Sequence, residues 1–208
     1  MDTFDLYKDI QCRTNGEIYL GVVGPVRSGK STFIKRFMDV LVLPKMTDEH
    51  AKERTVDELP QSASGKSIMT TEPKFVPKEA AEIQLAKDVS VLVRLIDCVG
   101  YMVEGAAGHM ENGAERLVKT PWNEKEIPFT KAAEIGTKKV IHDHSTIGIV
   151  VTTDGSIGEL PRNSYRAAEK KTIQELKSIG KPFVVLVNTR KPYSAEAKNV
   201  AEEIQKEY

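Results

Sequence analysis

The fold class is decided by one stretch near the N-terminus, Ile18-Tyr19-Leu20-Gly21-Val22-Val23 followed by Gly24-Pro25-Val26-Arg27-Ser28-Gly29-Lys30-Ser31. The first part is a short apolar run flanked by glycine, which is typical of a buried strand. The second part matches the pattern Gly-x-x-x-x-Gly-Lys-Ser/Thr of a phosphate-binding P-loop. Apolar residues then recur at helical spacing over residues 30–43, and Pro44 closes that helix. The order strand, P-loop, helix predicts a phosphate site at the edge of an α/β sheet.

In the rest of the chain, short apolar runs typical of strands alternate with segments of helical apolar spacing. We expect an exposed edge strand at 81–85 and buried strands at 89–96, 147–151 and 183–187. We expect helices at 130–142, 162–179 and 194–208, the last capped by Ser194. This alternation predicts a three-layer α/β fold with a mostly parallel sheet and one antiparallel edge strand. Residues 45–77 and 100–128 show no convincing period and are expected to be long, movable loops.

The composition excludes several classes of protein. The 208 residues carry 30 Lys and Arg against 30 Asp and Glu, so the formal net charge of zero provides no electrostatic footprint for nucleic acid or an anionic membrane. The two cysteines, Cys12 and Cys98, suggest neither a disulfide framework nor a zinc site. The N-terminus lacks an apolar signal region, and no apolar run is long enough to span a bilayer. We expect a cytoplasmic protein with one P-loop domain over residues 1–208, which ends without a closing strand and is therefore expected to be a fragment.

Each fixed residue of the P-loop has a physical role. Glycines let the backbone curl, so that successive N–H groups point at phosphate oxygens. The helix that begins near Gly29 adds the positive end of its dipole. Lys30 is expected to reach the β- and γ-phosphates, and the hydroxyl of Ser31 is expected to bind Mg²⁺.

A second acidic site follows the strand at 89–96, which leads into Asp97-Cys98-Val99-Gly100. An aspartate at the carboxyl end of a strand beside the P-loop strand can hold Mg²⁺, and the glycine lets its backbone approach the γ-phosphate. Between the two elements, a GTPase-like protein places a threonine that completes the metal shell. Thr70 and Thr71 are the candidates from the residues alone, against the alternative of an ordinary exposed loop.

The base-recognition segment departs from the GTPase pattern Asn-Lys-x-Asp. At the end of the last buried strand the chain reads Asn188-Thr189-Arg190-Lys191. The aspartate that would accept two hydrogen bonds from guanine is replaced by a lysine, which can only donate. This argues for ATP and against GTP.

The residues do not identify the group that positions the attacking water for hydrolysis. Tyr101 stands where many GTPases carry a glutamine that positions water, so hydrolysis is expected to be slow or to use another group. We hypothesise that Arg27, inside the P-loop, supplies positive charge to the phosphates. A GTPase-type switch and a structural module that holds nucleotide without turnover remain alternatives; a small-molecule kinase would need a second substrate pocket with lid arginines, and no convincing set is visible.

Several longer blocks carry a resemblance to a known family. They are the P-loop with its internal arginine, the segment from Asp57-Glu58-Leu59-Pro60 to Thr70-Thr71-Glu72-Pro73, Asp97-Cys98-Val99-Gly100-Tyr101, Thr120-Pro121-Trp122, Ala133-Glu134-Ile135-Gly136-Thr137 and Thr152-Thr153-Asp154-Gly155. Together these blocks resemble the stage IV sporulation protein A family over nearly the whole chain.

The resemblance implies an ATPase of endospore-forming bacteria, related to translation-factor-like GTPases but using ATP. It implies hydrolysis-dependent polymerisation of many copies into the basement layer of the spore coat, on the forespore surface in the mother-cell cytoplasm. It also implies anchoring by a small amphipathic membrane peptide, stage V sporulation protein M, contact with other coat proteins, and further domains beyond this chain.

The resemblance also assigns residues. The family's Walker A lysine falls on Lys30, its Walker B aspartate on Asp97 and its two sensor threonines on Thr70 and Thr71. Motifs and resemblance together predict a catalytic set of Arg27, Lys30, Thr70, Thr71 and Asp97, a metal set of Ser31, Thr71 and Asp97, and an ATP-binding set of Gly24, Pro25, Val26, Arg27, Ser28, Gly29, Lys30, Ser31, Thr32, Gly100 and Asn188.

Overall fold

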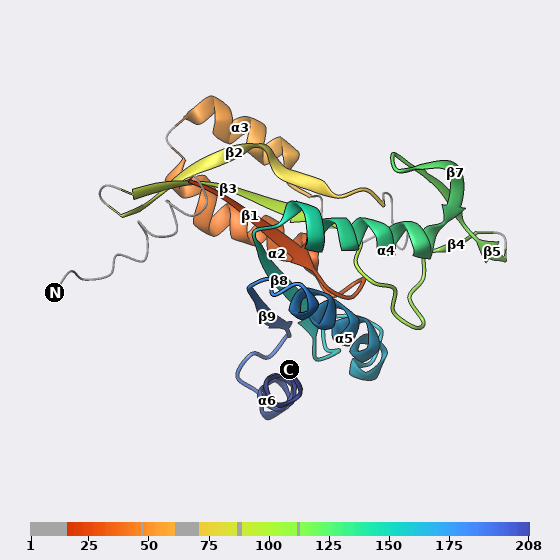
Figure 1. The fold of residues 1–208 in the computed structure, drawn as a ribbon. Coiled ribbons are helices and arrows are strands. Elements are labelled where there is room, and N and C mark those ends of the chain that lie inside the picture. The colour runs from red at the N-terminus through yellow and green to blue at the C-terminus, as the bar shows by residue number, and fades with distance from the viewer. Residues whose placement is uncertain (1–15, 47, 61–70, 87–88, 112) are drawn as a thin grey trace.

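The computed structural model describes residues 16–46, 48–60, 71–86, 89–111 and 113–208 (Figure 1). Its centre is a sheet of five strands in the order β2-β3-β1-β8-β9. The strands are β1 (Glu17–Val23), β2 (Lys74–Ala86), β3 (Val89–Asp97), β8 (Ile147–Thr153) and β9 (Phe183–Asn188). All neighbours are parallel except β2, which runs antiparallel to β3 at the edge. The predicted mostly parallel sheet with one antiparallel edge strand is therefore confirmed.

Helices cover both faces of this sheet. On one face, α2 (Lys30–Phe37) continues through a π turn (Met38–Val42) and a 3-10 turn (Leu43–Lys45). Its apolar side packs against β1, β2 and β3 through residues such as Ile34, Val76 and Leu95. On the other face lie α4 (Phe129–Lys139), its π extension (Val140–His144) and α5 (Arg162–Ser178), which bury Ile141, Tyr165 and Ile173 among others. The two apolar clusters on opposite faces make the fold three-layered.

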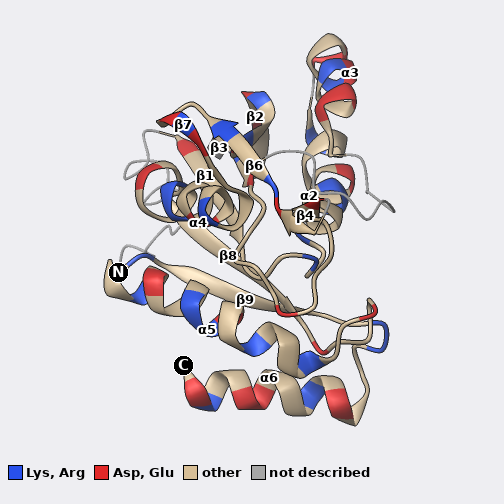
Figure 2. Cartoon of the chain, turned by 90° about the vertical axis from the view of Figure 1, so that its right-hand side faces the viewer, with Lys and Arg blue, Asp and Glu red and all other residues tan. Residues whose placement is uncertain are grey.

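The last helix, α6 (Ala195–Glu207), begins at the predicted cap, where the Ser194 side chain accepts a hydrogen bond from a first-turn N–H. It lies beside α5 (Figure 2), and both helices carry acidic and basic residues in alternation. Arg166 of α5 lies 3.8 Å from carboxylate oxygens of Glu203 and Glu207. Among the described residues, no helix combines the length and apolar character needed to cross a bilayer.

Two segments differ from the sequence-based expectation. Residues 45–77 were expected to be a loop, but they contain helix α3 (Glu49–Glu58), whose N-cap Asp48 accepts hydrogen bonds from two backbone N–H groups. The helix escapes a periodicity argument because only Thr55 on it is buried. Residues 100–128 were expected to be irregular, but they contain two small hairpins, β4 (Met110–Glu111) with β5 (Ala114–Glu115) and β6 (Leu117–Thr120) with β7 (Asn123–Pro128).

Parallel pairing places the functional segments together. Val22 of β1 is level with Asp97 of β3, and Thr153 of β8 is level with Asn188 of β9. Because parallel strands end at the same edge of a sheet, the P-loop after β1 meets the turns that follow β3, β8 and β9. This edge carries the candidate site.

Candidate nucleotide-binding site

The P-loop backbone requires its glycines. Gly24 and Gly29 have φ angles of 130° and 94°, in the region that glycine adopts without strain. A Cβ on Gly24 would lie 2.4 Å from the carbonyl oxygen of Val151, and one on Gly29 would lie 2.2 Å from the side-chain amide of Asn188. Close contact with β8 and β9 therefore selects glycine at both positions.

Lys30 lies buried at the start of α2 and turns back over the loop. Its ammonium donates to the carbonyl oxygen of Pro25 at 2.6 Å and to that of Gly24 at 3.4 Å. Burial lowers the pKa of Lys30, and only the nearby Cys98 and Asp97 oppose the shift. A desolvated ammonium held by two neutral carbonyls is poised for stronger, anionic oxygens such as those of phosphate.

Ser31 and Asp97 form the second part of the site. The Ser31 hydroxyl donates to Oδ2 of Asp97 at 2.8 Å, across 66 residues of sequence. The other carboxylate oxygen, Oδ1, is buried and has no hydrogen-bond partner. Burial raises the pKa of Asp97, and the hydrogen bond from Ser31 opposes that shift. A hydroxyl beside a carboxylate with a spare, buried oxygen is the hard-oxygen donor set that Mg²⁺ prefers, so these residues fit the ion.

The segment after Asp97 lies directly on the P-loop. The N–H of Val26 donates to the carbonyl oxygen of Tyr101 at 2.8 Å. Gly100 has a φ of 93°, and a Cβ there would lie 2.1 Å from the carbonyl oxygen of Gly24 and 2.7 Å from the Lys30 ammonium. Gly100 therefore brings its backbone next to the Lys30 ammonium and the P-loop.

The side chain of Tyr101 points elsewhere. Its ring is buried in the core between α4 and α5, with the ammonium of Lys171 4.6 Å from the ring centroid. Its hydroxyl is buried without a hydrogen-bond partner, and burial raises its pKa. In this conformation the tyrosine holds the turn in place and does not present its hydroxyl at the P-loop.

Not every predicted residue joins the cluster. Thr70 lies outside the described residues. Thr71 is buried, and its carbonyl oxygen packs so closely on α4 that a Cβ on Gly136 would lie 2.6 Å from it. No hydrogen bond within the described part of the chain connects Thr71 to Ser31 or Asp97. The structure thus brings Lys30, Ser31, Asp97 and Gly100 together without placing Thr71 at the carboxylate.

Arg27 makes a contact with a different segment of the chain. Among the described residues it is the one non-glycine with a positive φ, 61°, a conformation that L-residues adopt rarely. Its side chain is exposed and donates to the carbonyl oxygen of Ala107 at 3.2 Å. The guanidinium therefore ties the P-loop to the segment that follows Tyr101. Thr32, in the first turn of α2, has an exposed side chain.

The turn after β9 reaches the P-loop from the other side. The side-chain amide of Asn188 donates to the carbonyl oxygen of Ser28 at 3.1 Å. Next to it, the Thr189 hydroxyl donates to Oδ2 of Asp154 at 2.5 Å. Sequence reasoning assigned no role to Asp154; the block Thr152-Thr153-Asp154-Gly155 carried only the resemblance. The available signal was its position at the end of a buried strand next to β9.

Comparison with known proteins identifies the family to which this chain belongs. The family model described as "Stage IV sporulation protein A, ATPase domain" matches residues 1–208. The chain belongs to the stage IV sporulation protein A family. Three relatives of that name are 57% identical over 204 residues, in Clostridioides difficile (strain 630), and 52% identical over 208 residues, in Bacillus anthracis and in Bacillus subtilis (strain 168).

These alignments cover 98% of this chain in the first case and 100% in the other two, but 42% of each relative. The chain therefore spans less than half the length of the curated relatives that it matches. The match to an ATPase domain agrees with a site that joins a P-loop lysine to a hydroxyl and carboxylate pair.

Proposed function

We propose that residues 1–208 form one P-loop ATPase domain that binds ATP with Mg²⁺ and hydrolyses the bond to the γ-phosphate. The observation that carries this proposal is the hydrogen bond between Ser31 and Asp97 beside the buried ammonium of Lys30. We also propose the translation-factor-like GTPase type of P-loop fold, on the basis of the strand order and the antiparallel edge strand.

In this proposal each residue acts through its present position. Lys30 exchanges the carbonyl oxygens of Pro25 and Gly24 for phosphate oxygens and stabilises charge that develops on the γ-phosphate. Ser31 and Asp97 would hold Mg²⁺, which would supply positive charge that stabilises the phosphates. The backbone N–H of Gly100 approaches the γ-phosphate, because Gly100 lies next to both Lys30 and the P-loop.

Other sensing residues require movement. Thr71 packs on α4, and we propose that residues 71–73 shift to bring its hydroxyl to the metal. The Arg27 side chain donates to Ala107, and we propose that it exchanges this contact for the phosphates. We propose that these two changes accompany ATP binding, and that hydrolysis drives a change in shape that exposes assembly surfaces.

For the whole protein we propose hydrolysis-driven polymerisation into the basement layer of the spore coat, at the forespore surface in the mother cell. Other copies of this protein, a small amphipathic membrane-anchoring peptide and other coat proteins are the proposed partners. The name of the relatives, stage IV sporulation protein A, supports a role in sporulation.

A second candidate is a structural module that holds nucleotide without turnover. The burial of the Tyr101 side chain favours it, because this residue offers no group to orient a water molecule in the present conformation. A GTPase switch is the third candidate function. Lys191 argues against it, because a lysine cannot accept the hydrogen bonds that guanine donates.

The decisive experiment is phosphate release from the chain with ATP and with GTP, beside Lys30→Ala and the exposed control Lys35→Ala from the same helix. The proposal predicts turnover of ATP that Lys30→Ala abolishes and Lys35→Ala retains. Tight ATP binding without release of phosphate would support the structural module. Preference for GTP would overturn the assignment of ATP.

A further inference from the structure

The turns that follow β8 and β9 are joined by a hydrogen-bond network centred on Asp154. Its Oδ1 accepts from the N–H of Ser156 at 2.9 Å and from the Ser156 hydroxyl at 2.6 Å. Its Oδ2 accepts from the Thr189 hydroxyl at 2.5 Å. A single carboxylate therefore holds two turns that are 35 residues apart in sequence.

The same network uses the backbone donors of the second turn. The N–H of Arg190 donates to the Ser156 hydroxyl at 3.0 Å, and the N–H of Lys191 donates to the Thr189 hydroxyl at 3.1 Å. Both N–H groups are thus already satisfied within the protein. These two hydrogen bonds hold the turn after β9 against the turn after β8.

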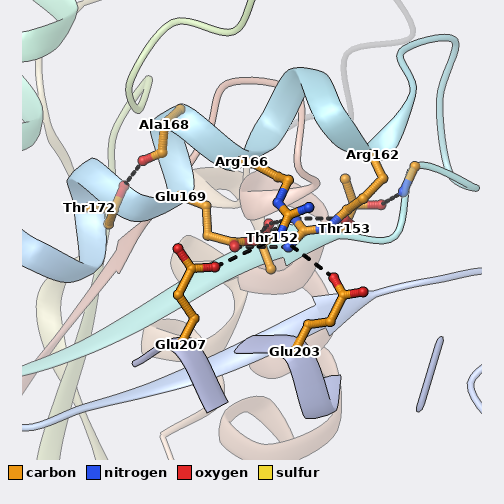
Figure 3. Close-up of polar contacts among 10 residues, drawn as sticks. Thr152, Thr153, Arg162, Arg166, Ala168, Glu169, Thr172, Glu203 and Glu207 are labelled. Atoms are coloured by element: carbon orange, nitrogen blue, oxygen red, sulfur yellow. Dashed lines mark hydrogen bonds and ion pairs between the residues drawn. The ribbon is translucent and has the colours of Figure 1, made fainter. Parts of the chain in front are cut away.

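A buried ion pair fixes the base of the network (Figure 3). Arg162 and Glu169 of α5 form two hydrogen bonds, at 2.6 and 2.8 Å, and Glu169 also accepts from the Thr152 hydroxyl at 2.5 Å. Arg162 donates further to the carbonyl oxygen of Thr153, the residue before Asp154. The carboxylate of Asp154 therefore starts from a strand end that α5 holds in place.

The far end of the network is the P-loop. Thr189 follows Asn188, whose amide donates to the carbonyl oxygen of Ser28 and would lie 2.2 Å from a Cβ on Gly29. A rotation of the turn after β9 would therefore disturb its contact with the P-loop. The network fixes the distance between the phosphate-binding loop and the turn where Lys191 replaces an acceptor.

We propose that Asp154, through Thr189, is a positioning residue that sets base selectivity by holding the 188–191 turn, and with it Lys191, at the place where a guanine-specific site needs a hydrogen-bond acceptor. This inference rests on the proposed ATP-binding function and adds to it a specificity determinant outside the P-loop. Guanine donates hydrogen bonds from its ring N–H and its exocyclic amine, and Lys191 can only donate, so the turn held in this arrangement disfavours GTP.

The test is equilibrium titration with fluorescent ATP and GTP analogues, beside nucleotide-free thermal melts. Thr189→Val removes the hydroxyl at nearly constant volume, and Thr189→Ser keeps it. Asp154→Asn removes the charge, and Asp57→Asn on the exposed face of α3 is its matched control. Loss of a hydrogen bond to a charged group costs on the order of 1.5–3 kcal/mol, which is about 10- to 100-fold in an equilibrium constant.

We expect Thr189→Val and Asp154→Asn to reduce the ratio of ATP affinity to GTP affinity at least tenfold, and Thr189→Ser and Asp57→Asn to leave it near the wild-type value. An unchanged ratio in Thr189→Val and Asp154→Asn, even with lower melting temperatures, would overturn the inference and leave these residues a structural role. Wild-type protein that binds neither nucleotide would overturn the proposed function itself, so the two failures are distinguishable.

Discussion

Removal of the buried carboxylate of Glu169 should destabilise the chain strongly. Glu169 is 1% exposed and accepts three hydrogen bonds, two from Arg162 and one from Thr152. In Glu169→Ala the guanidinium, 15% exposed as a side chain, keeps its charge without a counter-ion. Breaking one side of a buried pair typically costs about 3–5 kcal/mol. For a chain of this size, each kcal/mol shifts the melting temperature by roughly 2–4 °C, so the expected loss is on the order of 6–20 °C.

The assay is thermal unfolding followed by circular dichroism, together with urea unfolding to obtain the free energy of unfolding. The control is Arg166→Ala on the same helix, whose side chain is 50% exposed and whose partners lie at 3.8 Å. An exposed pair of this kind contributes about 0–1 kcal/mol. The double variant Arg162→Met/Glu169→Leu removes both charges and should recover most of the loss, because well-packed apolar residues can replace a buried pair.

The melting temperatures of the three variants together test whether the uncompensated charge of Arg162 causes the loss of stability. If Glu169→Ala melts within a few degrees of Arg166→Ala, the pair is not desolvated in solution and the reasoning is refuted. If the double variant is as unstable as Glu169→Ala, the loss comes from packing or from the Thr152 hydrogen bond and not from the uncompensated charge of Arg162.

Three further predictions concern two glycines and one helix cap. Gly100→Ala should abolish ATP turnover, because a Cβ at φ 93° would lie 2.1 Å from the Gly24 carbonyl oxygen; unchanged phosphate release would contradict this contact. Gly136→Ala should lower the melting temperature although alanine favours a helix by about 1 kcal/mol, since its Cβ would lie 2.6 Å from the Thr71 carbonyl oxygen; a rise would show that Thr71 does not pack there. Ser194→Ala should cost about 1 kcal/mol of unfolding free energy through the lost cap of α6, measured in urea, with nucleotide affinity unchanged; weaker nucleotide binding would mean that α6 influences the site.

The sheet was readable from the sequence because its strands are short apolar runs of consecutive residues. Each strand that the period predicts is present, and the ends differ by one or two residues except in β2, which is longer at its start. Helix α3 was missed because a helix that buries one residue has no apolar stripe to reveal it. The hairpins after Gly100 were missed because β4 and β5 have two residues each, and β7 is mostly polar and buries one residue, so it shows no alternation.

The P-loop could also be read directly, because its glycines, Lys30 and Ser31 are consecutive and their roles follow from local backbone geometry. Asp97 required one more inference, namely that parallel strands end at the same edge, and its hydrogen bond with Ser31 agrees with it. The roles of Thr70, Thr71 and Arg27 remain predictions. In the structure Thr71 packs on α4 and Arg27 donates to Ala107, and neither contact has a sequence signal.

The layers, the strand types and the P-loop can be derived from the amino-acid sequence, because they depend on periodicity and on residues adjacent in the chain. The side chains that meet across the sheet edge become known only from the folded structure. The Asp154 and Thr189 hydrogen bond joins residues 35 apart, and the direction of the Tyr101 side chain depends on how α4 and α5 pack over it. Contacts of this kind follow from the packing of whole elements against one another, which no local pattern encodes.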